Sequence, residues 1–174
     1  MNKTGNSEHC TTPEGRARDM ESIARAWLVK GCEQEHLLDW EGAIESYSRA
    51  LAADPADHQT RYFANNNLGY SLLQLGRFDE AEEYCEAAIL INPKQYNAHK
   101  NLGLAREGQG RWLDAALSLA EAVRLCPQDT RAWLHLQQLL AIKPGLMTQF
   151  PDLALTVTSL AVVYRSSGGI PQLN

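Results

Sequence analysis

The sequence lacks the short motifs that usually carry enzyme chemistry. Its 174 residues contain no HExxH zinc signature, no GxSxG nucleophile turn and no Walker-type glycine loop. The histidines lie far apart along the chain, at His9, His36, His58, His99 and His135. These absences predict no catalytic residue, no metal site and no cofactor, so an enzyme or a metal-binding protein is the least favoured kind of function.

The chain is also poor in cysteine and in positive charge. Four cysteines are scattered singly without a CxxC pair, which predicts free thiols in a reducing compartment. With 16 basic against 21 acidic residues the formal net charge is −5, and such a surface offers no general footprint for nucleic acid or anionic lipid. We therefore expect neither of these partners.

Long apolar runs are missing as well. Residues 1–13 are polar and lack the apolar segment of an export signal. The longest apolar stretch, Leu153 to Tyr164, is interrupted by hydroxyl side chains and is too short to cross a bilayer as a helix. These features predict a cytoplasmic protein with no membrane insertion.

The sequence does contain an internal repeat. Two copies match at an offset of 34 residues, and the paired positions are Leu68 and Leu102, Gly69 and Gly103, Gly76 and Gly110, Ala81 and Ala115, Ala88 and Ala122, and Pro93 and Pro127. A third copy lies upstream at an offset of 38, with Trp27, Gly31, Trp40, Ala43, Ala50 and Pro55 in the same order. The four extra residues correspond to about one helical turn.

A half copy follows the third full one. Residues Ala132 to Leu136 match Ala98 to Leu102, but Pro144 and Gly145 arrive where a second helix should begin. Asp129 precedes this segment and is a suitable N-cap for it. The half copy therefore predicts a helix that closes one end of the array.

Each full copy reads as two amphipathic helices joined by a tight turn. Small residues at matching positions of both helices allow the pair to approach closely, and a proline ends each second helix. The first copy departs from the others, because Lys30 stands where they have Leu68 and Leu102, and Leu38 where they have a turn glycine. We expect its hairpin to be looser or its turn differently shaped.

The period of 34 residues, the Leu-Gly pair and the closing proline resemble the tetratricopeptide repeat. The resemblance implies an all-α fold, an α-α superhelix of three helical hairpins with C-terminal capping helices. The predicted organisation is a flexible segment at 1–18, an array at 19–143 with repeats at about 24–57, 62–95 and 96–129 and a half-repeat cap at 130–142, and an apolar helix and tail at 144–174.

In this family the first helices line a concave face on which a peptide or a partner's helix docks. The resemblance thus implies a protein or peptide ligand. On each first helix, the residues one step off the packing stripe and spaced by three or four share one face. With two neighbouring asparagines, these are Arg25, Leu28, Cys32, Phe63, Asn66, Asn67, Tyr70, Asn97, Lys100, Asn101, Leu104, Arg131, Leu134 and Gln138. Any one of them is equally well read as an ordinary solvent or packing position.

Some members of the family clamp the C-terminal carboxylate of heat-shock chaperones with lysine, arginine and asparagine. At the corresponding positions here, Asn67 matches, but Leu28, Cys32, Asn97 and Asn101 replace the other clamp residues. These side chains lack the cations that a carboxylate needs. We expect no tight binding of such tails.

The function predicted is therefore a protein-interaction module, acting as an assembly adaptor or scaffold. A dedicated chaperone for one client protein, like those of secretion systems, fits the length and repeat count equally well. The apolar segment Leu153 to Tyr164 leaves two alternatives open. It packs on the cap as a final solvating helix, which we favour, or it forms a surface for self-association.

Overall fold

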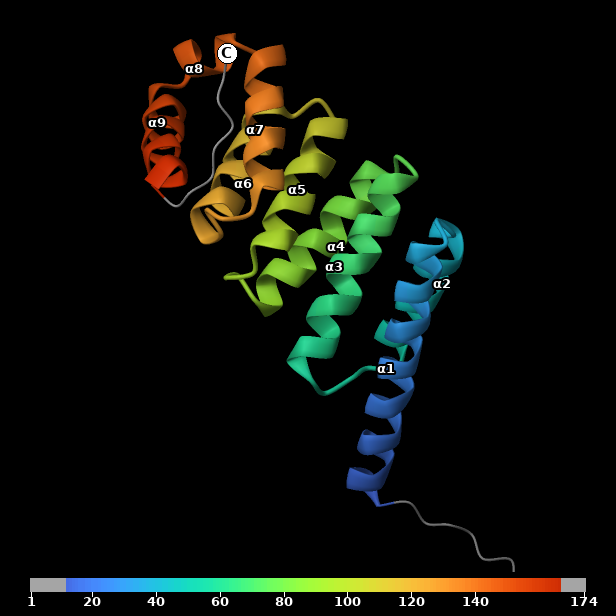
Figure 1. Ribbon diagram of the computed structural model, residues 1–174. Coiled ribbons are helices and arrows are strands. Elements are labelled where there is room, and N and C mark those ends of the chain that lie inside the picture. The colour runs from blue at the N-terminus through green and yellow to red at the C-terminus, as the bar shows by residue number, and fades with distance from the viewer. Residues whose placement is uncertain (1–11, 167–174) are drawn as a thin grey trace, which may run out of the picture.

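The structure is a computed structural model that describes residues 12–166, and it is built from stacked α-helices (Figure 1). Three antiparallel pairs come first: α1 (Pro13–His36) with α2 (Trp40–Ala52), α3 (His58–Gln74) with α4 (Phe78–Ile91), and α5 (Tyr96–Gly108) with α6 (Trp112–Leu125). They are followed by α7 (Thr130–Ile142), the short α8 (Gly145–Gln149) and α9 (Pro151–Ser166). The described part of the chain contains no strand, and the predicted all-α superhelix is confirmed.

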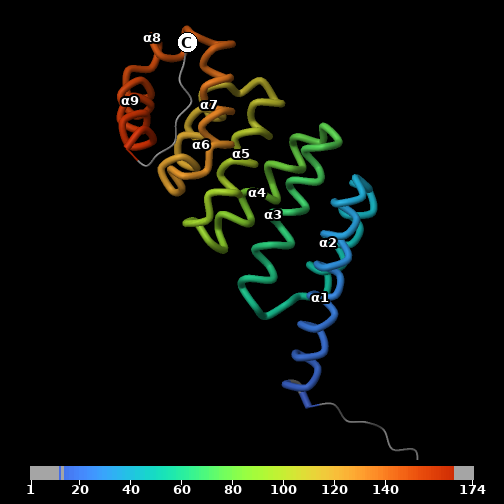
Figure 2. Tube along the Cα trace, viewed as in Figure 1, coloured from blue at the N-terminus to red at the C-terminus, as the bar shows by residue number. Residues whose placement is uncertain are grey.

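Consecutive pairs stack along one direction, as the Cα trace shows (Figure 2). Each second helix packs on the next first helix, and α3 also contacts both α1 and α5. The first helices therefore line up along one face of the stack. Among the described residues, no helix combines the length and apolar character needed to cross a bilayer.

Glycines set the distance between the two helices of each hairpin. A Cβ atom added to Gly31 would lie 2.4 Å from the ring of Tyr47, which is fully buried. A Cβ at Gly103 would lie 2.7 Å from Leu119 Cγ and 3.2 Å from the backbone oxygen of Ala115. The distances below 3 Å, to Tyr47 and to Leu119, are shorter than real packing contacts, so a side chain at either glycine would force the neighbouring helix to shift.

The turn of the first hairpin has the same shape as the other two, which corrects the expectation of a looser or different turn. Leu38 adopts φ +59°, in the left-handed region, where Gly76 and Gly110 adopt +70° and +78°. In every copy the residue that follows donates a backbone hydrogen bond to the residue five positions earlier: Asp39 N to Gln34 O (2.9 Å), Arg77 N to Leu72 O (3.0 Å) and Arg111 N to Arg106 O (2.9 Å). This pattern is a Schellman closure of the preceding helix.

Side-chain hydrogen bonds hold this turn in the absence of glycine. The Asp39 carboxylate accepts a bond from Gly42 N at 3.0 Å and another from Gln34 Nε2 at 3.2 Å. The first copy thus tolerates a leucine in the left-handed region, at a conformational cost that its glycine counterparts avoid.

The four extra residues after the first copy lengthen a helix. Helix α3 starts at His58, whereas the equivalent of the α5 start would be residue 62. Asp57 caps the added turn by accepting hydrogen bonds from Gln59 N and Thr60 N. The insertion therefore leaves the stacking of later helices unchanged.

The predicted boundary at residue 18 is wrong. Helix α1 begins at Pro13, and Thr12 Oγ1 caps it by accepting a hydrogen bond from Gly15 N at 3.1 Å. A threonine followed by proline at the first helical position is a sequence signal for such a start. The remainder of the expected flexible segment, residues 1–11, lies outside the described residues.

An ion network joins the second and third hairpins. The Glu82 carboxylate binds Arg106 Nε at 2.9 Å and Arg111 Nη1 at 2.8 Å, and its side chain is 15% exposed. Burial by itself would raise the Glu82 pKa, but hydrogen bonds from Arg106, Gln109 and Arg111 outweigh it and lower the pKa. Glu82 therefore links neighbouring repeats.

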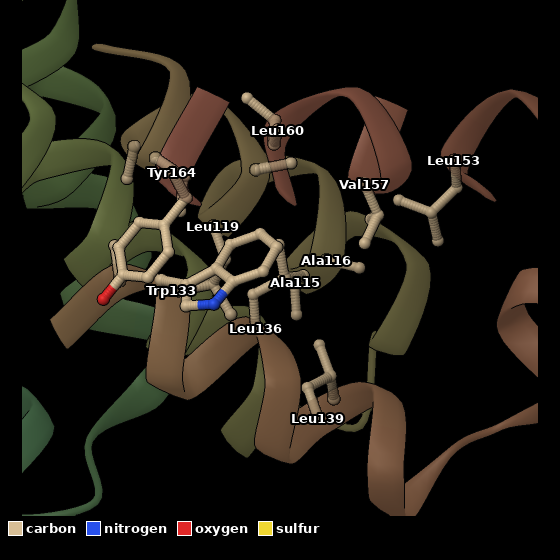
Figure 3. Close-up of a cluster of buried hydrophobic side chains, with 14 of the residues drawn as sticks. Ala115, Ala116, Leu119, Trp133, Leu136, Leu139, Leu153, Val157, Leu160 and Tyr164 are labelled. Carbon is tan, nitrogen blue, oxygen red and sulfur yellow. The ribbon is translucent and has the colours of Figure 1, made fainter. Parts of the chain in front are cut away.

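Helix α9 packs against α6, and a shared apolar core joins these two helices to α7 (Figure 3). Its predicted stripe of Leu153, Val157, Leu160 and Tyr164 is buried, and the Tyr164 ring stacks on Trp133 with centroids 5.1 Å apart. Helix α7 begins at Thr130 and Asp129 caps it, as predicted. The segment thus packs on the cap, the alternative that we favoured. Self-association through its remaining surface stays a prediction.

The left-handed leucine predicts that Leu38→Gly stabilises the protein. The glycine relieves a cost of about 1 kcal/mol, and the 69% exposed side chain gives up little buried area. Chemical denaturation measures the gain. Leu37→Gly is the matched control, because Leu37 is also largely exposed, at 79%, but has φ −88°. Stabilisation by both variants, or by neither, would contradict the turn geometry.

The ion network predicts that Glu82→Gln lowers the stability of the fold by an amount that depends on pH. Because folding lowers the Glu82 pKa, its stabilisation is present above the unfolded value of about 4.3 and disappears as pH falls through the folded value. We expect a loss of about 1 kcal/mol near neutral pH that shrinks on acidification. Unfolding curves at several pH values test this. Glu83→Gln, an exposed neighbour without an ion pair among the described residues, should have little effect at any pH.

The docking of α9 predicts opposite outcomes for two leucines on one helix. Leu153 is 2% exposed and Leu155 is 69% exposed. Leu153→Ala should destabilise the protein by about 2–4 kcal/mol through transfer and cavity terms. Leu155→Ala should change the free energy of unfolding by no more than about 0.5 kcal/mol. Equal effects in thermal or chemical unfolding would show that α9 is not packed in this orientation.

Candidate functional site

The first helices enclose a concave pocket of about 490 Å³ between α3, α5 and α7. The residues predicted from the sequence that line it are Asn66, Asn67, Tyr70, Asn97, Lys100, Asn101, Leu104 and Arg131. Gln74 and His135 complete the lining and were missed. Both lie four residues beyond a predicted member, and His135 also repeats the position of Asn101 at the offset of 34, a signal that the sequence already contained.

Amides form the floor of this pocket and connect three repeats. Asn101 Nδ2 donates to Asn66 Oδ1 at 3.2 Å, and Asn66 Nδ2 donates to Asn67 Oδ1 at 3.0 Å. Asn67 Nδ2 in turn points to the sulfur of Cys32 at 3.7 Å, which links α5 through α3 to α1. Asn101 Oδ1 is buried without a partner among the described residues, an arrangement that costs about 1–3 kcal/mol.

Basic side chains stand on one side of the pocket. Lys100 is 8% exposed, and burial, followed by the charge of Arg131, lowers the pKa of its ammonium group. Burial and the charge of Lys100 also lower the His135 pKa. Arg131 is held by Asp129, whose pKa the Arg131 hydrogen bond lowers, and by Tyr96 Oη at 3.2 Å. The site therefore combines amide groups with a positive edge.

Tyr70 and Leu104 supply the apolar part of the lining. Both are half-buried, and the Tyr70 ring stands edge-on to Trp40 with centroids 6.0 Å apart. Such an edge-to-face pair holds the tyrosine in place. The pocket thus offers fixed apolar surface beside its polar groups.

The structure does not gather the other predicted residues into this pocket. Arg25 pairs with Glu21 at 2.8 Å. Leu28 and Cys32 pack against a core that the first hairpin shares with the next ones. The remaining three lie on exposed helix surface away from the lining: Phe63, Leu134 and Gln138. Their contact with a ligand stays a prediction.

The described residues contain no group of three or more histidine, cysteine or acidic side chains that could hold a metal ion. His99 Nε2 lies 2.9 Å from the backbone oxygen of Pro93. Burial raises the pKa of the Cys85 thiol to about 12, so this thiol is protonated at neutral pH and poorly nucleophilic. Neither residue belongs to the pocket.

Stacked helical hairpins with a hollow on their aligned first helices define a helical-repeat module for protein interaction. A family model described as tetratricopeptide repeat matches residues 28–93 and 66–130, which together make up more than half of the chain. The chain belongs to the tetratricopeptide-repeat family. This family and this fold are those of protein-interaction modules.

Individual relatives agree with this assignment. Small glutamine-rich tetratricopeptide repeat-containing protein 2 of Mycosarcoma maydis is 30% identical over 111 residues, which are 63% of this chain and 30% of that protein. The Arabidopsis OM64 TPR domain superposes with a TM-score of 0.63 at 27% identity over 69% of this chain and 96% of that domain. The second TPR of Spaghetti (RPAP3), bound to the HSP90 peptide SRMEEVD, superposes with a TM-score of 0.58 at 25% identity over 63% of this chain and 91% of that chain. The aligned part of the chain spans less than a third of the Mycosarcoma relative.

Proposed function

We propose that this protein is an assembly adaptor that binds an extended segment of a partner protein in the pocket between α3, α5 and α7. The observation that carries the proposal is the row of amides along the pocket floor. An extended peptide carries unpaired N–H and C=O groups along both edges, and asparagine side chains can donate to one and accept from the other. The pocket would thereby bind the backbone of an extended peptide whatever side chains the peptide carries.

The apolar lining would then select among segments. Tyr70 and Leu104 offer ring and aliphatic surface on either side of the amides. A partner residue of moderate size and apolar character would lose water contact there and gain contact with both. A peptide with alternating apolar and polar side chains suits this lining best.

A structural relative supports peptide binding on this scaffold, since the second TPR of Spaghetti is seen with the HSP90 peptide SRMEEVD. The expectation that chaperone tails do not bind tightly here still stands as a prediction. Leu28 and Cys32, which replace clamp residues, are half-buried and pack against a core that the first hairpin shares with the next ones. The proposed ligand is therefore an internal or terminal segment of a different partner.

A dedicated chaperone for one client is the second candidate, favoured by apolar surface outside the pocket. Leu90 is 86% exposed and Leu117 is 47% exposed, and both border a hollow of about 440 Å³ between α4, α5 and α6. Exposed apolar surface of this kind suits a client that is unstable alone. An adaptor would bind a folded partner through a short segment, whereas a chaperone would be needed to keep its client soluble.

The experiment compares two matched variants with the wild type. Partners captured from native lysate by chemical cross-linking are identified and purified, and their affinity is then measured by calorimetry. Tyr70→Ala combined with Asn97→Ala should weaken binding about tenfold, or about 1.4 kcal/mol, because it removes one apolar and one amide contact. Leu90→Ala, on the other surface, should leave the affinity of an adaptor partner unchanged.

Two outcomes would count against the adaptor. Unchanged affinity in the double variant, with an unfolding midpoint like that of the wild type, would place the binding site elsewhere. Loss of binding in Leu90→Ala alone, with a client that precipitates without the protein, would favour the chaperone.

A further inference from the structure

The two ends of the array expose very different surfaces. In the second copy, Leu68 is buried in a core that it shares with Ala43 and Tyr47 of the preceding hairpin. The first copy has an exposed Lys30 at this position, and no helix precedes α1 in the part of the chain that the structure describes. A polar surface of this kind keeps the end of a repeat array soluble and unpaired.

The opposite end is closed by α9, whose outer face is apolar. The charged residues of this helix are Asp152 in its first turn and Arg165 in its last. No charged residue lies between them, and on the outer face Leu155 is 69% exposed and Val162 is 63% exposed. Because the end of an array normally carries polar residues, this apolar face marks a surface that another chain covers.

The hydroxyl groups on this face do not need water. Thr158 Oγ1 donates a hydrogen bond to Ala154 O at 2.7 Å, and Ser159 Oγ donates one to Leu155 O at 2.9 Å. These bonds satisfy each hydroxyl donor within the helix itself. A second chain can therefore cover the face without leaving these donors unpaired, and the small side chains allow a close approach.

The outer face is symmetric about a point between Thr158 and Ser159. Leu155 precedes Thr158 by three residues, and Val162 follows Ser159 by three. Residues spaced by three or four share one helix face, so these four side chains form a single strip, the α9 strip. When two such strips face each other with the helices antiparallel, Leu155 of each copy meets Val162 of the other. The strip is therefore complementary to itself.

The charges at the ends of α9 complete this symmetry. Asp152 lies six residues before Thr158, Arg165 lies six residues after Ser159, and both charged side chains are exposed. In the antiparallel arrangement, Asp152 of each copy lies at the level of Arg165 of the other. A parallel arrangement would instead place like charges together. The charge pattern thus favours a second, antiparallel copy of α9 as the occupant of this face.

We infer that this protein forms a twofold dimer in which the α9 strip packs antiparallel on the same strip of a second copy. The contact is isologous, so it closes at two chains and leaves neither strip exposed. One helix pair buries less than the roughly 1,600 Å² of a standard interface, so the dimer is weak and depends on concentration. The inference does not rest on the proposed pocket, although the dimer would place two such pockets in one assembly.

Sedimentation velocity of the full-length chain over a wide concentration range tests this contact. The wild type should change from monomer to dimer as its concentration rises. Leu155→Glu should weaken the dimer at least about tenfold, because it places an unpaired carboxylate within the apolar strip. Leu90→Glu is the matched control, since Leu90 is 86% exposed on α4, and it should leave dimerisation unchanged. Both variants should keep the unfolding midpoint of the monomeric wild type.

Charge reversals test the orientation of the two helices without changing the α9 strip. Asp152→Lys and Arg165→Glu should each weaken the dimer about three- to tenfold, because each turns two attractive pairs into repulsive ones. An equimolar mixture of the two variants should form a mixed dimer about as tight as the wild type, since opposite charges face each other again. In a parallel pair, like charges already meet, and neither reversal would weaken the dimer.

Engineered cysteines test the register. Under mild oxidation, a mixture of Leu155→Cys and Val162→Cys should form a disulfide-linked dimer that contains one chain of each kind. Neither variant should form such a dimer alone, because equal positions lie seven residues apart along an antiparallel pair, about 10 Å at 1.5 Å per residue. The wild type, oxidised in the same way, gives the background from the native cysteines.

Four results would each overturn the inference: a wild type that stays monomeric at every concentration, a dimer that Leu155→Glu leaves intact, charge reversals without effect, or cross-links that form as readily in one cysteine variant as in the mixture. Tyr70→Ala combined with Asn97→Ala should dimerise like the wild type, because neither residue belongs to α9. Loss of partner binding in that variant therefore reports on the pocket alone, and either proposal can fail without the other.

Discussion

The close approach of the two helices within each hairpin is the constraint on which the rest of the structure depends. Gly31, Gly69 and Gly103 each face a side chain of the partner helix at a distance that leaves no room for a Cβ atom. Because this distance repeats, successive hairpins have similar shape and stack with similar geometry. The stack aligns the first helices, and their alignment produces the pocket.

The same regularity explains why polar groups can be buried along the first helices. Asn67, Asn101 and His135 occupy one position in consecutive copies. Regular stacking brings neighbouring amides within hydrogen-bonding distance, so much of the polar surface of the pocket floor is satisfied internally. Within the pocket, the Asn101 Oδ1 atom is buried without a partner among the described residues. A ligand or an ordered water that donates a hydrogen bond to this oxygen would satisfy it.

The ends of the array follow different physical rules from its middle. At the C-terminal end, α9 supplies the apolar side chains that another hairpin would have supplied, and Tyr164 stacks on Trp133. In the first hairpin, an aspartate and a glutamine hold the turn in a conformation that glycine adopts elsewhere. Local side-chain hydrogen bonds thus hold a turn that glycine makes possible in the other copies. Leu38 consequently adopts a left-handed backbone conformation that is strained for leucine.

The sequence by itself determined the repeat, the number of hairpins, the cap at α7 and the apolar stripe of α9, because periodic spacing of small and apolar residues depends on local helix geometry. Whether that stripe packs on the cap was decided by the tertiary structure. The sequence misjudged the turn at Leu38 and the start of α1, since each depends on particular hydrogen bonds. Only the tertiary structure decided which candidate residues share a pocket and that most of the Lys100 side chain is buried there. Those properties arise between helices far apart in the chain, where spacing along one helix carries no information.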